Sequence, residues 1–281
     1  MSVYEAPAKI NLSLLVSPPR PDRYHPLASL VQTIEWCDRL GVGLGGEGRD
    51  ELDSDIEDNL VSRALVIARE FGSVPPLAMS LHKEIPIAAG MGGGSSDAAA
   101  ALLAGSDFGD VPRDSLPAAA SRVGADVSLF LTGGTVMMGG VGETVEAVKS
   151  ATGFAVAVVV PEFGLSTRGV YERWDRLEGP EGDEVPNGLL PPSLRDRMPM
   201  RNDLLPAALD VEPLLGDFMA DVSSLWGTIV CLTGSGSACF GYFPTLDEAS
   251  DAASAASELV RAGRGVELRE RGVAIVSPGT P

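Results

Sequence analysis

The sequence predicts an α+β fold, and three observations lead to that prediction. With 281 residues, the chain is long enough for two modest domains that each bury a hydrophobic core. Segments with the period of a strand are mixed with segments with the period of a helix, without the regular alternation that builds a parallel sheet. Aromatic residues make up only 5% of the chain, so alanine, valine, leucine and isoleucine must form the cores.

The N-terminal part is predicted to hold strands, turns and one helix. Three segments alternate like strands, and these are residues 10–16, 27–36 and 40–44. An acidic, glycine-rich connection over residues 45–55 follows them. The apolar residues of 60–71 repeat at helical spacing, with Asp58 and Asn59 as candidate caps and Gly72 as the end of the helix.

The middle of the chain is predicted to return to a strand over residues 77–82, before a glycine-rich loop and an alanine-rich helix. Ser115 is a candidate cap for a short helix that ends at Val123. Strands are expected over residues 135–138 and 154–160, and the second of these is apolar enough to be buried.

The C-terminal part contains residues 178–200, which are rich in proline, glycine and charge and are expected to form a long surface loop. The sequence Thr245-Leu-Asp-Glu248 is a capping box that opens an alanine-rich helix reaching about residue 261. Further strands are expected over residues 228–232, 239–243, 265–269 and 273–276.

The chain is strongly acidic, with a formal net charge of −18. This charge argues against nucleic acid or an anionic membrane surface as a partner, because both are bound through lysine and arginine. The three cysteines are widely spaced and suggest neither a metal site nor a disulfide framework. The start of the chain lacks the pattern of a secretory signal, and the longest apolar run is too short to cross a bilayer, so we expect a cytoplasmic protein.

Residues 86–97 are the strongest candidate for a binding site. Four glycines within residues 90–94 bring bare backbone to one point, and Ser95 and Ser96 then open a helix. The first amides of a helix lack internal partners and lie at its positive end, so such a loop suits an anion, most often phosphate. The loop is not a Walker A motif, because no Gly-Lys-Ser/Thr follows it, and a tight turn before a core helix is the alternative.

Three further segments carry residues that could do chemistry. Lys9, one of only three lysines, enters an apolar strand pattern beside Asn11 and must find a partner there unless it faces solvent. Asp126 leads an apolar segment, either as a functional acid or as an ordinary helix cap. Residues 232–241 alternate glycine with serine, and they either pack against a phosphate or the first loop, or form a plain hairpin turn.

Tyr24 and His25 lie side by side after a proline-rich turn. A tyrosine and a histidine in a loop can stack on a base and hydrogen-bond to it. A single surface histidine more often has no such role, so the pair gains meaning only from the other segments.

Taken together, these segments resemble the GHMP kinase superfamily. Its three signatures are matched in order by residues 7–12, 86–98 and 232–241, so the resemblance spans nearly the whole chain. Within the superfamily the chain is similar to the 4-diphosphocytidyl-2-C-methyl-D-erythritol kinase family. The features that carry this narrower resemblance are Lys9, Tyr24-His25, Gly124-Ala-Asp126 and Asn202-Asp-Leu204.

The resemblance implies a two-lobed α+β kinase with its active site in the cleft between the lobes. A lobe like ribosomal protein S5 domain 2, with the ATP loop and catalytic residues, would span residues 1–150, and a ferredoxin-like lobe would span residues 151–281. The implied reaction uses ATP and Mg²⁺ to phosphorylate the 2-hydroxyl of a small CDP-linked methylerythritol substrate in isoprenoid biosynthesis. The sequence leaves the oligomeric state open.

The resemblance also implies a role for each candidate residue. Asp126 would accept or orient the hydroxyl proton, and Lys9 would hold Asp126 ionised and stabilise the transferring phosphoryl group. His25 would hydrogen-bond the cytosine and Tyr24 would stack on it. Asn11 would assist positioning, and Thr167 and Tyr171 would complete the substrate pocket. The ATP phosphates would lie on Pro86, Ala89, Gly90, Gly92, Gly93, Gly94, Ser95 and Ser96, and no residue is assigned as a metal ligand.

Two residues depart from the pattern of that family. Arg23 stands where glycine is common, so the loop is strained if the site needs a positive φ, or it has another shape, or Arg23 reaches a substrate phosphate. Ser128 stands where proline is common. The alternatives are a GHMP kinase for mevalonate, homoserine or a sugar, and a non-catalytic nucleotide-binding regulator. Tyr24-His25 argues against the first, and the presence of Lys9 and Asp126 argues against the second.

Overall fold

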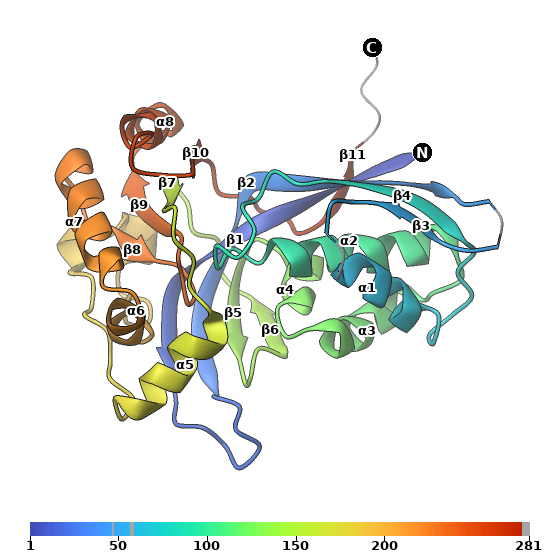
Figure 1. Cartoon of the computed structure of the whole chain (residues 1–281), viewed down its shortest axis with the longest axis horizontal. Helices are drawn as coiled ribbons and strands as arrows, with labels where there is room; N and C mark the ends of the chain where they lie inside the picture. The colour runs from blue at the N-terminus through green and yellow to red at the C-terminus, as the bar shows by residue number, and fades with distance from the viewer. Residues whose placement is uncertain (47, 57–58, 277–281) are drawn as a thin grey trace.

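The computed structural model describes residues 1–46, 48–56 and 59–276, and it has the predicted α+β fold (Figure 1). Its strands form two sheets, one of seven strands and one of four. The candidate cap Asp58 lies outside the described residues. The candidate cap Asn59 accepts a hydrogen bond from the backbone N–H of Val61, which confirms its predicted role.

The larger sheet is built around a long hairpin of its first two strands. Its members are β1 (Ser2–Val16), β2 (Leu27–Leu44), β3 (Glu51–Asp53), β4 (Leu77–His82), β5 (Thr135–Gly139), β6 (Thr144–Ala147) and β11 (Ala274–Val276). The main order is β11-β1-β2-β4-β3, and β5 pairs with both β2 and β6. All pairs are antiparallel except β3 with β4. The chain therefore returns to the first sheet near its C-terminus.

Four helices cover one face of this sheet, as Figure 1 shows. They are α1 (Leu60–Ala68), α2 (Gly93–Phe108), α3 (Leu116–Val123) and α4 (Val127–Thr132), with a 3-10 turn at Arg113–Ser115. The middle of α2, residues 98–102, is completely buried. Its alanines let the helix approach the sheet closely, which brings the start of α2 up to the edge where the glycine-rich loop lies.

The smaller sheet is antiparallel, with the order β10-β7-β9-β8. These strands are β7 (Ala155–Val160), β8 (Cys231–Leu232), β9 (Cys239–Phe243) and β10 (Ala262–Val266). Its helices are α5 (Thr167–Arg176), α6 (Leu205–Val211), α7 (Leu214–Trp226) and α8 (Leu246–Ala255), and two 3-10 turns lie at Asn187–Leu189 and Pro192–Leu194. The expected capping box is present, because the Thr245 side chain accepts from the Glu248 N–H.

A hydrophobic core joins the two sheets. Ile10 and Ile34 of the larger sheet belong to the same buried cluster as Val158 and Phe240 of the smaller one. Such a shared core fixes the strand ends that carry polar side chains against each other. The division into 1–150 and 151–281 stays a prediction.

Some predicted strand boundaries were wrong. Residues 27–36 and 40–44 are one strand, and the change of pattern between them reflects a bulge, where the pairing jumps from Cys37 opposite Pro7 to Ile34 opposite Ala8. The connection over 45–55 contains β3, a short strand at the sheet edge. The strand expected at 265–269 lies instead at Ala262–Val266, where backbone pairing with β7 decides its position.

Helix and loop predictions also need correction. The helices expected to reach residues 71 and 261 end at Ala68 and Ala255, and the Ser115 hydroxyl donates to the Pro112 carbonyl instead of capping α3. The segment 178–200 is irregular as expected but is not only surface. It buries four side chains in the shared core or beside it, namely Val185, Leu190, Leu194 and Met200. The sequence reading did not anticipate α5, α6 and α7.

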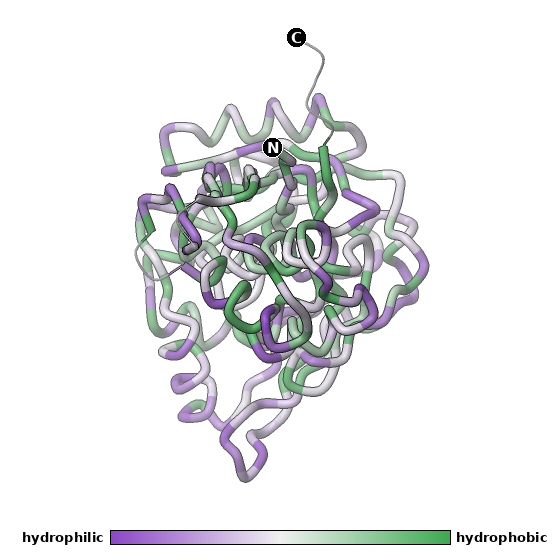
Figure 2. Tube along the Cα trace, turned by 90° about the vertical axis from the view of Figure 1, so that its right-hand side faces the viewer, coloured by the Kyte–Doolittle hydropathy of each residue, from purple (hydrophilic) through white to green (hydrophobic). Residues whose placement is uncertain are grey.

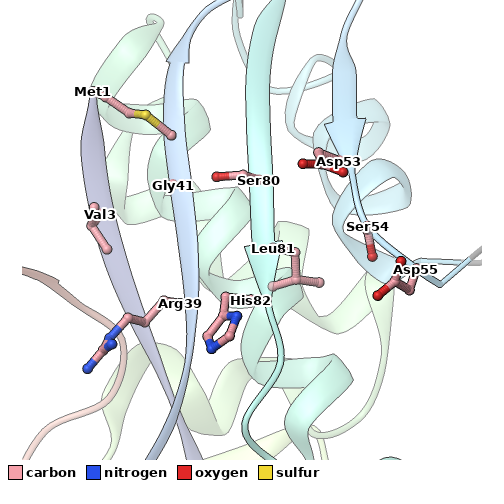
Figure 3. Close-up of a pocket in the computed structure, with 10 residues that line it drawn as sticks. All are labelled: Met1, Val3, Arg39, Gly41, Asp53, Ser54, Asp55, Ser80, Leu81 and His82. Atoms are coloured by element: carbon pink, nitrogen blue, oxygen red, sulfur yellow. The ribbon is translucent and has the colours of Figure 1, made fainter.

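A cavity lies over β1, β2 and β4 of the larger sheet, on the face opposite its helices. Figure 3 shows Arg39 and His82 on neighbouring strands of this face, and both line the cavity, which has a volume of about 480 Å³, together with Gly41 and Ser80. This cavity contains none of the candidate site residues. Among the described residues, no helix is long and apolar enough to cross a membrane.

Candidate active site

A cavity of about 880 Å³ lies where β1, the glycine-rich loop, the start of α4 and α5 meet. β1 contributes Lys9 and Asn11, whose side chains leave the same face of the strand because they are two residues apart. The candidate residues that line this cavity are Lys9, Asn11, Tyr24, His25, Gly90, Gly92, Ser95, Asp126, Thr167 and Tyr171. The fold thus brings together most of the residues singled out in the sequence.

Lys9 is held in one position by its surroundings. Only 6% of its surface is exposed, its backbone N–H donates to the Met91 carbonyl at 3.0 Å, and its ammonium group donates to Asn11 Oδ1. Asn11 is fixed in turn, because its Nδ2 donates to Ser29 Oγ at 2.8 Å and its backbone N–H donates to Thr233 Oγ1 at 2.9 Å. Burial lowers the pKa of Lys9, and the charge of Asp126 partly opposes that effect.

Asp126 precedes the first turn of α4 but does not act as a cap. Its backbone is helical and its side chain makes no capping hydrogen bond. The Asp126 carboxylate acts electrostatically on two other cavity residues. It favours the charged form of Lys9. Burial raises the pKa of Tyr171 to about 12, and the charge of Asp126 adds to that effect. A carboxylate beside a buried ammonium group is a suitable pair for handling the proton of a hydroxyl.

The glycine-rich loop separates this cavity from a second one of about 360 Å³. Gly90, Gly92 and Ser95 line both cavities. Gly90 has a φ of 79°, and a Cβ there would lie 2.7 Å from the Gly236 carbonyl oxygen. Gly92 has a φ of 73° and takes the N-cap position of α2, with a hypothetical Cβ 2.7 Å from the Phe130 ring. Glycine is therefore required at both positions for conformation and for space.

A buried charge cluster supports the loop from below. The Lys83 ammonium group contacts Asp38 and lies 2.6 Å from Asp97 Oδ2, while Asp38 Oδ1 accepts from the backbone N–H groups of Glu84 and Ile85. Burial, reinforced by the Asp38 charge and opposed by Lys83, raises the pKa of Asp97 to about 7. Asp97 Oδ1 and the Ser96 hydroxyl are buried without a hydrogen-bond partner among the described residues.

The serine–glycine segment 232–241 packs against the first loop. The Ala238 N–H donates to the Ala89 carbonyl at 3.1 Å, and Asn202 Nδ2 donates to the carbonyls of Leu232 and Gly234. This packing is one of the two functional alternatives that the sequence left open. The segment encloses Lys9 and Asn11 from the side of the smaller sheet, since a Cβ on Gly234 would lie 3.3 Å from Lys9 Nζ and 3.3 Å from Asn11 Oδ1.

The wall opposite the glycine-rich loop is made of side chains. His25 Nε2 lies 2.8 Å from Asp175 Oδ1, and its ring packs against Tyr171 at 5.0 Å and edge-on to Trp174 at 5.5 Å. Thr167 Oγ1 and Ser235 Oγ are 2.8 Å apart, which joins α5 to the segment 232–241. Tyr24 remains 64% exposed, so its ring is available at the cavity mouth.

Pro86, Ala89, Gly93 and Gly94 line the second cavity, whereas Ser96 lines neither. Ser96 is completely buried under the first turn of α2, so its side chain faces the protein interior. Lining residues that the sequence analysis did not assign to a site include Asn59, Leu60 and Lys83 in the second cavity and Asp175 in the first. Asn59 was visible only as a cap, and Asp175 only through its four-residue spacing from Tyr171 on an unanticipated helix.

Comparison with known proteins identifies close relatives. Residues 59–134 match the GHMP kinases N terminal domain. The chain is 37% identical to the 4-diphosphocytidyl-2-C-methyl-D-erythritol kinase of Rhizobium leguminosarum bv. trifolii, with 89% of each chain covered. It is 36% identical to the protein of the same name from Mycolicibacterium gilvum, with 83% of this chain and 79% of that protein covered.

Solved structures share the whole fold. A crystal structure of 4-(cytidine 5'-diphospho)-2C-methyl-D-erythritol kinase aligns with a TM-score of 0.82 and 33% identity over 95% of this chain and 98% of that one. Homoserine kinase from Cytophaga hutchinsonii aligns with a TM-score of 0.68 at 16% identity, over 98% of this chain and 97% of that one. The second likeness shows the fold alone.

Proposed function

The chain belongs to the 4-diphosphocytidyl-2-C-methyl-D-erythritol kinase family of GHMP kinases, and from this premise we propose how its two cavities divide the reaction. It is a small-molecule kinase that transfers a phosphoryl group from ATP to the 2-hydroxyl of 4-diphosphocytidyl-2-C-methyl-D-erythritol in isoprenoid biosynthesis. One observation carries the division: Gly90, Gly92 and Ser95 line both cavities, so a phosphate on the loop faces a second ligand beside Lys9 and Asp126.

The cavity of about 360 Å³ is the proposed ATP site. The amides at the start of α2 and the positive end of its dipole would hold the phosphates, and Gly92, Gly93 and Gly94 leave the backbone uncovered. Mg²⁺ would accompany ATP and neutralise charge on its phosphates. Among the described residues there is no cluster of three or more His, Cys, Asp or Glu side chains that could hold a metal.

In the proposed transfer, the acceptor oxygen forms a bond to the γ-phosphorus while the bond to the ADP oxygen breaks. Asp126 orients the hydroxyl and receives its proton, since its side chain is not used as a cap. Lys9 stabilises the charge on the transferring group. Asn11 holds Lys9 in place through its own hydrogen bonds to Ser29 and Thr233.

The side-chain wall is the proposed cytidyl site. His25 would hydrogen-bond the cytosine, with its orientation set by Asp175 and by packing on Tyr171. Tyr24 would stack on the base, because its ring is exposed at the cavity mouth, and Thr167 would complete the pocket beside Ser235. With ATP as the donor, we place the enzyme in the cytoplasm.

The decisive experiment measures ATP-dependent ADP release with Mg²⁺ against four acceptors: the cytidyl substrate, mevalonate, homoserine and galactose. We expect turnover with the cytidyl compound alone. The variant Asp126→Asn should lower kcat about 10²- to 10⁴-fold, the usual contribution of a general base, with little change in the KM for ATP. Asp221→Asn, at an exposed position of α7, is the matched control and should leave kcat unchanged.

Two outcomes would overturn parts of this proposal. Turnover of another alcohol would keep the kinase chemistry but remove the cytidyl assignment of Tyr24 and His25. Unchanged turnover in Asp126→Asn would remove the acid from the reaction.

A further inference from the structure

Arg23 is the least explained residue of the large cavity. Arg23 belongs to the polar turn of the β1–β2 hairpin, directly before Tyr24, and it lines the cavity. Its backbone has a φ of 69°. Non-glycine residues avoid this region because Cβ crowds the following carbonyl oxygen. Figure 2 shows the hydrophilic tip of this hairpin projecting from the molecule.

Hydrogen bonds within the hairpin turn hold Arg23 in this conformation. The Arg23 N–H donates to the Arg20 carbonyl at 2.8 Å, and the Arg20 N–H donates to the Tyr24 carbonyl at 2.9 Å. Asp22 accepts from the Tyr24 N–H and pairs with the Arg20 guanidinium at 2.6 Å. The turn therefore fixes a positive φ whatever side chain stands at position 23. A strained residue that persists in a binding site is a reason to look for a function of its side chain.

The charges of the cavity indicate what that function is. Its cations are Lys9, Arg23 and Arg168. Lys9 lies beside the proposed reaction centre, and Arg168 is paired with Glu172 at 2.8 Å. The Arg23 guanidinium makes no hydrogen bond or ion pair within the described part of the chain. It is thus the cavity's uncompensated cation in a chain of net charge −18.

We propose that Arg23 binds the diphosphate of the acceptor, so that the strained turn contributes a phosphate contact as well as the base-reading pair Tyr24 and His25. The inference rests on the proposed function, in which the acceptor is a cytidine diphosphate derivative. Arg23 adjoins the base-reading residues in sequence and lines the same cavity, but it does not line the ATP cavity. A guanidinium group suits a diphosphate because it can donate two parallel hydrogen bonds to phosphate oxygens.

Binding of CDP and of cytidine, measured by calorimetry on the whole chain, separates the diphosphate from the base. Wild-type protein should bind CDP more tightly than cytidine, and more so at low salt. Arg23→Gly should weaken CDP binding about tenfold, the size of one charge-assisted hydrogen bond, and leave cytidine binding unchanged. Arg23→Asn should do the same, since asparagine tolerates a positive φ without carrying charge.

The control for strain is Glu178→Gly. Glu178 is exposed, has a φ of 61° and lies outside the cavity, so its glycine variant relieves strain without removing a cavity charge. It should bind CDP and cytidine as the wild type does, and the melting temperature of all variants confirms that they fold.

Equal weakening of CDP and cytidine in Arg23→Gly would overturn the inference and make Arg23 a determinant of loop shape. Unchanged binding of both would overturn it too. Wild-type protein that phosphorylates the cytidyl substrate but binds CDP no better than cytidine would overturn this inference while leaving the proposed function standing. Absence of turnover would instead remove the function itself.

Discussion

The two walls of the cleft are built from different materials. Residues 86–97 with 232–241, the proposed phosphate site, form what we call the phosphate wall, which presents backbone, and its glycines at 90, 92, 234 and 236 have positive φ. The acceptor wall, residues 23–25 with α5, presents side chains, and its polar members are tied by side-chain contacts such as His25 with Asp175. The shape of the first wall therefore depends on backbone conformation, and that of the second depends on contacts between side chains.

This difference sets how each wall tolerates substitution. Gly90 has a positive φ, and a Cβ there would lie 2.7 Å from the Gly236 carbonyl oxygen, well inside van der Waals contact, so this position tolerates substitution poorly. On the acceptor wall, position 23 also has a positive φ, yet it carries arginine, which is exposed and lines the cavity. Strain alone is a moderate cost, and strain combined with backbone overlap is prohibitive.

The strongest test of the comparison is Gly90→Ala. An alanine at this position would have a strained φ, and its Cβ would lie 2.7 Å and 2.9 Å from the carbonyl oxygens of Gly236 and Thr233. We therefore expect destabilisation of about 3 kcal/mol and loss of ATP binding. Gly153→Ala has the strain alone, with no atom within 4 Å, and should cost about 1 kcal/mol. Gly188→Ala has neither and should stabilise by about 0.5 kcal/mol.

Urea unfolding with each variant measures these differences. Equal effects of Gly90→Ala and Gly153→Ala would show that the segments 86–97 and 232–241 separate at little cost, and the description of the phosphate wall as a fixed backbone would then be wrong.

The contrast also explains what the sequence could reveal. The phosphate wall is written in contiguous residues, so the loop, its following helix and the partner segment 232–241 could each be identified locally. Asp175 could not, because its contact with His25 forms only when α5 packs beside residues from the start of the chain. The continuous β2 was missed for a related reason, since the bulge opposite Pro7 and Ala8 interrupts the alternation without interrupting the strand.

On the acceptor wall, His25→Ala should raise the KM for the cytidyl substrate about tenfold, as expected for one lost hydrogen bond with its packing, and leave the KM for ATP unchanged. The chain has one other histidine, His82, on the face of the larger sheet opposite its helices (Figure 3). His82→Ala is therefore a matched control and should change neither constant. Equal rises in both KM values for His25→Ala would indicate that the two walls are not independent.

The smallest expected effect concerns the charge cluster beneath the phosphate wall. The pKa of Asp97 is raised to about 7 in the folded chain, chiefly by burial, from an ordinary value near 4 in the unfolded chain. Between these values the folded state holds a proton that the unfolded state has lost, so the stabilisation is complete below about pH 4 and is lost as pH rises through about 7.

Asp97→Asn cannot titrate, so its free energy of unfolding relative to wild type should increase from pH 5 to pH 8. Asp210→Asn, at an exposed ion pair, should show no such trend. Parallel pH profiles for wild type and Asp97→Asn would mean that Lys83 keeps Asp97 ionised over the whole range and that burial does not decide its protonation.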